Sequence, residues 1–97
     1  MVNTDANMTH KLNNAVIAIT GAGSGIGRAL ALQSARLGAR LALSDIGEQS
    51  LQETKGLIEK ECGQAEVLCS VVNVAEKQQM VSWAQQVKDH YGELNVI

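Results

Sequence analysis

The sequence of 97 residues has no proline, no low-complexity tract and no apolar run approaching the ~20 residues that a membrane-spanning helix needs. Its formal net charge of −2 gives no basic surface for nucleic acid and no polybasic membrane anchor. The first segment is polar and lacks the apolar core of a signal peptide, so we interpret residues 1–14 as a flexible N-terminal leader. We therefore expect a soluble, cytoplasmic protein that binds neither nucleic acid nor a membrane.

The sequence also lacks the spacings that hold metals or form redox pairs. Cys62 and Cys69 do not form a C-x-x-C motif, and His10 and His90 have no partners at ligand spacing. We expect unpaired thiols, which suit a reducing cytoplasm, and no metal site.

Strand and helix patterns alternate along residues 15–97. Short apolar strands are predicted at 15–19, 40–44, 67–72 and 94–97, and helices lie between them, the second at 48–61 and the third at about 76–90. This alternation predicts an α/β fold with a parallel sheet, helices on both faces and right-handed crossovers. The Rossmann rule gives the strand order 3-2-1-4 and places a nucleotide at the switch between strands 1 and 4.

Helical spacing predicts which face of each helix is buried. The expected inner stripes are Ile26, Leu30, Gln33 and Leu37 in the first helix, Leu51, Thr54, Leu57 and Ile58 in the second, and Met80, Ala84, Val87 and Tyr91 in the third. Trp83 is expected to be a core residue as well.

The stretch TGAGSGIG, from Thr20 to Gly27, joins the first strand to the first helix. Glycines at such a junction let the backbone come close to a ligand. The unpaired N–H groups and the positive dipole end of the new helix then suit a phosphate. The spacing is Gly21-x-x-x-Gly25-x-Gly27, and no G-K-[ST] follows, so the loop is neither the commonest dinucleotide fingerprint nor a P-loop.

Thr20 followed by Gly-x-x-x-Gly-x-Gly resembles the cofactor loop of the short-chain dehydrogenase/reductase family. Further matches lie at Asp45, at Asn73-Val74 and at Tyr91 to Ile97, where the family enters its fourth strand. The resemblance covers nearly all of the chain after Asn14 but only the first part of a full-length relative. It implies an oxidoreductase that transfers hydride between a nicotinamide cofactor and a carbonyl or alcohol of a small-molecule substrate.

Asp45 ends the second strand, eighteen positions after Gly27. An acidic residue about 20 positions past the loop holds a ribose hydroxyl in NAD sites, so we favour that role over a surface carboxylate that starts a turn. A 2′-phosphate ~5 Å from this carboxylate would meet roughly 3 kcal/mol of repulsion at an effective dielectric constant of ~20. Ser24 and Ile46 occupy the two positions where NADP-preferring relatives often carry a basic residue. We therefore predict NAD over NADP.

Asn73 and Val74 close the third strand. The resemblance implies that the Asn73 side chain meets the adenine amino group and that Val74 lines the adenine pocket. Asn73 also lies three residues before Glu76, which is the spacing of a capping box, so helix capping is an equal alternative. With these two residues, the predicted cofactor-binding set is Thr20, Gly21, Ser24, Gly25, Ile26, Gly27, Asp45, Ile46, Asn73 and Val74.

No residue is predicted to be catalytic. Family members use a Tyr with a Lys four positions later, whereas the single tyrosine here is Tyr91, followed four positions later by Asn95. We expect Tyr91 to be a packing residue. We expect the chain alone to be the first part of an NAD-binding domain and to be inactive. A homo-oligomer of the full-length relative would form through regions outside this chain. Two alternatives are a non-catalytic module that binds NAD or ADP-ribose, and a Rossmann-like methyltransferase that binds S-adenosylmethionine.

Overall fold

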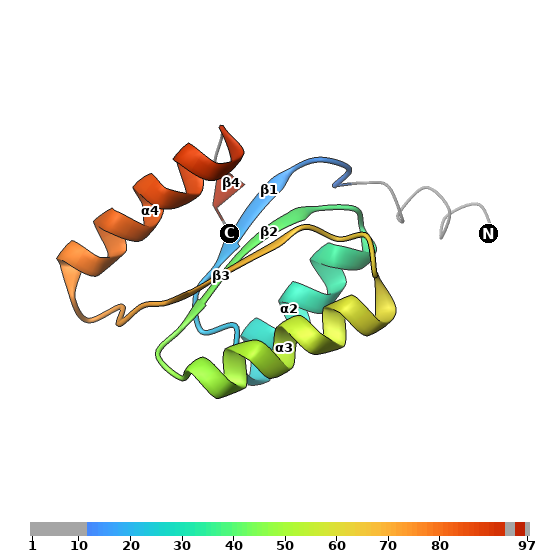
Figure 1. Cartoon of the computed structure of the whole chain (residues 1–97), viewed down its shortest axis with the longest axis horizontal. Coiled ribbons are helices and arrows are strands. Elements are labelled where there is room, and N and C mark those ends of the chain that lie inside the picture. Colours follow the sequence, from blue (N-terminus) through green and yellow to red (C-terminus); the bar gives the residue numbers. More distant parts are fainter. Residues whose placement is uncertain (1–11, 93–94, 97) are drawn as a thin grey trace.

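The computed structural model describes residues 12–92 and the backbone of residues 95–96. Its elements are, in order, β1 (Val16–Ile19), α2 (Gly25–Arg36), β2 (Arg40–Asp45), α3 (Glu48–Glu61), β3 (Val67–Val71), α4 (Lys77–Tyr91) and β4 (Asn95–Val96). The four strands form one parallel sheet in the order β3-β2-β1-β4, which confirms the predicted α/β class and strand order (Figure 1).

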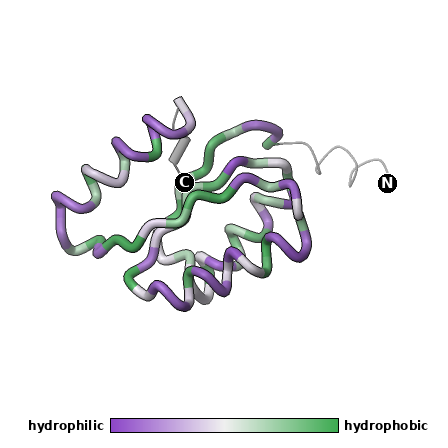
Figure 2. The backbone as a smooth tube through the Cα atoms, in the orientation of Figure 1, coloured by the Kyte–Doolittle hydropathy of each residue, from purple (hydrophilic) through white to green (hydrophobic). Residues whose placement is uncertain are grey.

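The helices form two layers around the sheet. Figure 1 shows α2 and α3 on one side and α4 on the other. Alternate residues of the strands therefore face different cores: Ile17 and Ile19 face α2 and α3, whereas Val16 and Ala18 face α4. Because both faces of β1 are covered, all four of its residues are buried, and the tube in Figure 2 is hydrophobic along this strand.

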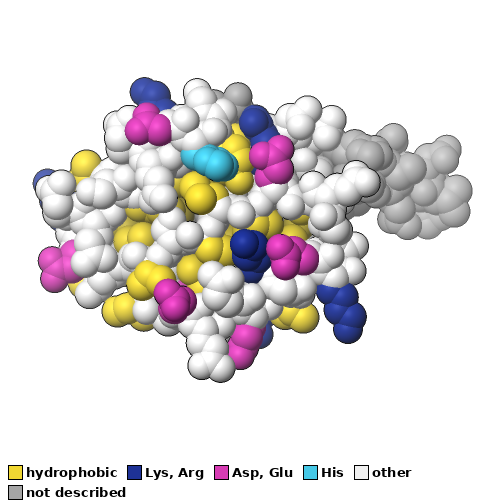
Figure 3. All heavy atoms as spheres, in the orientation of Figure 1, with side chains coloured by type: hydrophobic (Ala, Val, Ile, Leu, Met, Phe, Trp, Pro, Cys, Tyr) yellow, Lys and Arg dark blue, Asp and Glu magenta, His cyan; other side chains and the backbone are white. Residues whose placement is uncertain are grey.

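Strand β3 forms one edge of this sheet. Its residues are only partly buried, and Val71 is 52% exposed. In Figure 3, hydrophobic side chains are visible in a band between α4 and α3, while acidic and basic side chains are scattered around that band without a cluster of one sign. The described residues contain no helix that is both long and apolar enough to span a membrane.

The predicted inner stripe of α2 is wrong at two of its four positions, since Leu30 and Leu37 are partly buried but the other two are exposed. Ile26 is 87% exposed and Gln33 is exposed, whereas the buried residues are Ala31, Ser34 and Ala35. Gly27 lies on the same helical face as these small residues, and a Cβ there would overlap the carbonyl oxygen of Gly21, so this face begins in close contact with the preceding loop. Leu30 and Leu32 are partly buried and pack against the core, whereas Ile26 is left at the surface.

The other two stripes need smaller corrections. In α3, Leu51, Thr54 and Ile58 are buried as predicted, but Leu57 is 40% exposed. In α4, Ala84 is exposed, and the larger Trp83 occupies the core beside Val87.

Tyr91 is buried, and its hydroxyl donates a hydrogen bond to the carbonyl of Leu41 at 2.7 Å. The packing role predicted for this residue is confirmed.

The boundary predicted after residue 14 stays a prediction, because residues 1–11 lie outside the described part of the chain. Residues 12–14 are attached to the fold, since the N–H of Leu12 donates to the carbonyl of Leu37 and that of Asn14 to Gly38. Leu94 and Ile97 of the predicted fourth strand, and Glu93 before it, also lie outside the described residues.

Candidate nucleotide-binding site

The predicted site residues gather at one edge of the sheet, because parallel strands end on the same side. The glycine loop follows β1, Asp45 and Ile46 follow β2, and Asn73 and Val74 follow β3. A hydrogen bond from the N–H of Val72 to the carbonyl of Asp45 (3.1 Å) joins the last two segments. We call this the carboxyl edge.

The glycine loop needs its glycines for two different reasons. Gly21 and Gly25 have positive φ angles of 64° and 56°, and a Cβ at either position would have no neighbour within 4 Å. They turn the chain and leave open space beside the backbone. Gly27 serves close packing, since a Cβ there would overlap the carbonyl oxygen of Gly21.

The N-terminus of α2 opens at this loop. Ser24 is the N-cap residue, with an extended backbone and no side-chain hydrogen bond to the helix, and the first turn contains no acidic residue. The first N–H groups of a helix have no partner within the helix, and they carry its positive dipole end. Because no side chain of this turn neutralises that end, it is suited to an anion.

The Asp45 carboxylate is held by backbone N–H groups on both of its oxygens. Oδ1 accepts from Gly47 at 2.9 Å, and Oδ2 accepts from Gly23 at 2.8 Å. The bond from Gly47 lowers the pKa of Asp45, with a further contribution from Gly23, while partial burial opposes the shift. The side chain is therefore ionised at neutral pH, and each oxygen keeps a lone pair that can accept a hydroxyl proton.

Apolar side chains are exposed around these polar groups. Ile26, Ile46 and Val74 are 87%, 67% and 58% exposed, and Thr20 is exposed as well. Exposed apolar side chains beside polar groups are the kind of surface that ligand sites use.

The capping alternative for Asn73 is wrong. The N-cap of α4 is Glu76, and it makes no side-chain cap hydrogen bond. The Asn73 Oδ1 atom instead accepts from the N–H of Ala75 at 3.0 Å, within the turn that precedes the helix. This oxygen has a second lone pair, so the turn does not prevent a contact with adenine.

Sequence reasoning missed three residues that shape the loop. Gly23 lies too close to Asp45 Oδ2 and Ser50 for a Cβ, at 2.9 Å and 2.8 Å. Arg28 and Thr54 form hydrogen bonds to the loop carbonyls. A buried threonine on an otherwise apolar stripe was the available signal for Thr54, whereas nothing in the spacing pointed to Arg28.

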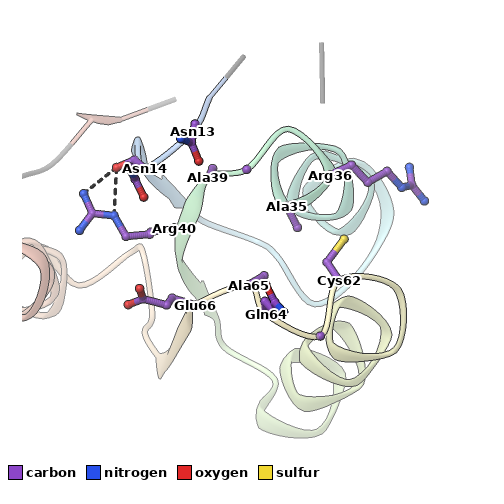
Figure 4. Close-up of a pocket in the computed structure, with 12 residues that line it drawn as sticks. Asn13, Asn14, Ala35, Arg36, Ala39, Arg40, Cys62, Gln64, Ala65 and Glu66 are labelled. Atoms are coloured by element: carbon purple, nitrogen blue, oxygen red, sulfur yellow. Dashed lines mark hydrogen bonds between the residues drawn. The ribbon is translucent and has the colours of Figure 1, made fainter. Parts of the chain in front are cut away.

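A pocket lies elsewhere, at the amino ends of β2 and β3. It has a volume of about 560 Å³, and Figure 4 shows the ends of α2 and α3 beside it. The guanidinium of Arg40 donates a hydrogen bond to the carbonyl of Asn14, and Arg36 forms a salt bridge with Glu61. Helix C-termini carry the negative end of the dipole, so this pocket is poorly suited to a phosphate.

Comparison with known proteins agrees with this geometry. The short chain dehydrogenase family model matches residues 15–97. The chain is 40% identical over 82 residues to epidermal retinol dehydrogenase 2 of Mus musculus, covering 84% of this chain and 26% of that protein. It is 32% identical over 87 residues to levodione reductase of Leifsonia aquatica, covering 90% of this chain and 33% of that protein.

Solved structures give the same result. The structure of levodione reductase matches with a TM-score of 0.83 at 32% identity, over 86% of this chain and 32% of that one. A short chain dehydrogenase/reductase from Burkholderia phymatum in complex with NAD matches with a TM-score of 0.81 at 32% identity, over 88% and 30%. The chain therefore spans about a quarter to a third of the length of these relatives. It belongs to the short-chain dehydrogenase family.

Proposed function

We propose that this chain supplies the adenosine- and pyrophosphate-binding half of an NAD-dependent oxidoreductase. In the complete enzyme, hydride passes between the nicotinamide and a carbonyl or alcohol of a small-molecule substrate. The observation that carries the proposal is the pairing of an uncapped helix N-terminus with an ionised carboxylate at one sheet edge. The first suits a pyrophosphate and the second suits a ribose diol.

Each part of the nucleotide has a matching group. Gly21, Gly25 and Gly27 let the pyrophosphate reach the N–H groups that open α2, with Thr20 and Ser24 beside it. Asp45 accepts from the adenosine ribose. The exposed Ile46, Ile26 and Val74 offer apolar surface for adenine, and Asn73 offers an acceptor to its amino group.

Charge favours NAD over NADP. The NADP 2′-phosphate would lie against the Asp45 carboxylate, and both groups are negative at neutral pH. Ser24 and Ile46, the neighbouring positions on the loop and after β2, carry no positive charge to offset that repulsion. The solved relative in complex with NAD is consistent with this choice.

Turnover requires groups that this chain does not offer. Its single tyrosine, Tyr91, is buried, and burial raises the pKa of its hydroxyl to about 12. The hydroxyl also donates to Leu41. We therefore expect the chain alone to bind the cofactor without reducing or oxidising a substrate. Its cytoplasmic location and its assembly into homo-oligomers stay predictions.

Calorimetric titration of the 97-residue chain tests the proposal. The account predicts binding of NAD and of ADP-ribose, with NADP bound at least tenfold more weakly. Equal affinity for NAD and NADP would contradict the cofactor choice. Binding of S-adenosylmethionine in place of NAD would contradict the oxidoreductase assignment and favour a methyltransferase.

A further inference from the structure

Two residues inside the glycine loop, Ala22 and Gly23, use all their backbone N–H and carbonyl groups in hydrogen bonds to the rest of the fold. Their N–H groups bond to the end of β2: that of Ala22 donates to the carbonyl of Ser44 at 2.9 Å, and that of Gly23 to Asp45 Oδ2 at 2.8 Å. Since these two N–H groups are already used, N–H groups for a phosphate must come from the segment that opens α2.

The two carbonyls of this pair are anchored by side chains from the helices. The Thr54 hydroxyl of α3 donates to the carbonyl of Ala22 at 2.7 Å, and Thr54 is completely buried. Arg28 Nη2 donates to the carbonyl of Gly23 at 2.5 Å, and its Nε donates to Thr54 Oγ1 at 2.9 Å. The Arg28 guanidinium therefore links the Gly23 carbonyl to the Thr54 hydroxyl, which itself donates to the carbonyl of Ala22.

Arg28 is itself fixed by α3. Its Nη2 also lies 3.2 Å from the carbonyl of Ser50 and 3.3 Å from Glu53 Oε1. The guanidinium has a fixed fork of donors, so one side chain can satisfy several acceptors at defined angles. Its Nε and Nη2 atoms donate to protein acceptors, which separates this role from that of a direct phosphate ligand.

A glycine-rich loop is costly to order when a ligand arrives, because glycine has the most conformational freedom to lose. Anchoring Ala22 and Gly23 before the ligand binds removes part of this cost, which is the general advantage of a preorganised site. We propose that Arg28 and Thr54 are positioning residues, an inference that rests on the proposed function. They hold the loop carbonyls against α3, so that the N–H groups opening α2 are set to receive a pyrophosphate.

Matched variants of the 97-residue chain test this role. Arg28→Leu removes the fork, and Arg28→Lys keeps the charge but replaces the planar fork of donors with a single ammonium nitrogen. Thr54→Val removes the hydroxyl, and Thr54→Ser retains it. Arg36→Leu is the control on the same helix, because Arg36 pairs with exposed Glu61 away from the loop.

The measurements are equilibrium binding of NAD, ADP and adenosine, and amide hydrogen exchange at Gly23. We expect Arg28→Leu, Arg28→Lys and Thr54→Val to weaken NAD and ADP tenfold or more and adenosine less than twofold. Exchange at Gly23 should accelerate at least tenfold in the same variants. Thr54→Ser and Arg36→Leu should stay within twofold of the unsubstituted chain. If Arg28→Leu does not fold, the Thr54→Val and Thr54→Ser pair decides the question.

Other results would overturn the positioning role. Equal losses for ADP and adenosine would indicate a purely structural effect. Full retention of NAD affinity in Arg28→Lys would indicate that charge, not the fork, is what matters. Unchanged NAD binding in Arg28→Leu would contradict only this role. Absence of NAD binding by the unsubstituted chain would contradict the proposed function itself, while exchange at Gly23 would still report whether the anchors hold the loop.

Discussion

The two edges of the sheet differ in a way that cavity size does not reveal. The amino edge has a pocket of about 560 Å³, and the C-terminal ends of α2 and α3 lie beside it. The carboxyl edge has the open glycine loop, the N-terminus of α2 and the Asp45 carboxylate. The groups that suit a nucleotide lie at the carboxyl edge. The direction of the helix dipoles therefore indicates this site better than pocket volume does.

The largest effect is expected from crowding the loop. Gly27→Ala places a Cβ on the carbonyl of Gly21, and we expect it to destabilise the fold by about 3 kcal/mol and to abolish NAD binding. Gly63→Ala is the counterpart at the amino edge, where the new Cβ meets only the carbonyl of Glu59, at 3.5 Å. It should change stability by less than about 0.5 kcal/mol. Equal urea unfolding midpoints for the two variants would contradict the claim that the glycine loop is more closely packed than the amino edge.

The next effect concerns the carboxylates at the two edges. Asp45→Asn should lower NAD affinity about ten- to a hundredfold, since hydrogen bonds to charged groups contribute about 1.5–3 kcal/mol. It should also narrow the preference for NAD over NADP, because the repulsion is removed. Glu66→Gln at the amino edge is the control and should leave both affinities unchanged, as measured by calorimetry. An unaltered NAD affinity in Asp45→Asn would exclude the ribose role.

A smaller effect is expected at Tyr91, which belongs to the part of the core near the amino edge. Tyr91→Phe removes the hydrogen bond to Leu41 and should cost about 1 kcal/mol of unfolding free energy. NAD affinity should not change, because the hydroxyl lies away from the carboxyl edge. Thermal and urea unfolding measure the first quantity, and a titration measures the second. Loss of NAD binding in a folded Tyr91→Phe variant would contradict the separation of the two edges.

The smallest effect is the pH dependence from Asp45. Its folded-state pKa is lowered from 3.8, so the stability that it contributes is complete above the unfolded pKa and is lost as the pH falls through the folded one. The difference in unfolding free energy between the unsubstituted chain and Asp45→Asn should be constant above about pH 5 and shrink below about pH 4. A difference that stays constant to pH 2.5 would show that the carboxylate is not held in the folded state.

The sequence allowed the fold to be predicted because its signals were local and repeated. Four apolar strands alternating with helical patterns fixed the parallel order, and the glycine spacing and Asp45 indicated the carboxyl edge. The exposure of Ile26 could not be obtained in this way, because this residue continued the apolar stripe of Leu30 and Leu37. The competing requirement, contact between Gly27 and Gly21, depends on tertiary packing.

The anchors of the loop were beyond sequence reasoning for a related reason. Arg28 lies off the apolar stripe, where a charged residue is usually solvated, and its acceptors on α3 are 22 to 26 positions away. Asn73 shows the opposite failure, since a capping-box spacing was present but the helix begins after Glu76. Hydrogen bonds between distant segments fix Arg28, whereas a local hydrogen bond from the N–H of Ala75 holds Asn73.

Backbone amide NMR during a titration with NAD tests the central claim most directly. The account predicts that shifts concentrate at residues 20–27, 45–46 and 73–74. Residues 35–40 and 62–66, at the amino edge, should remain unchanged. Shifts centred on the amino edge, or no shifts at saturating NAD, would contradict the account.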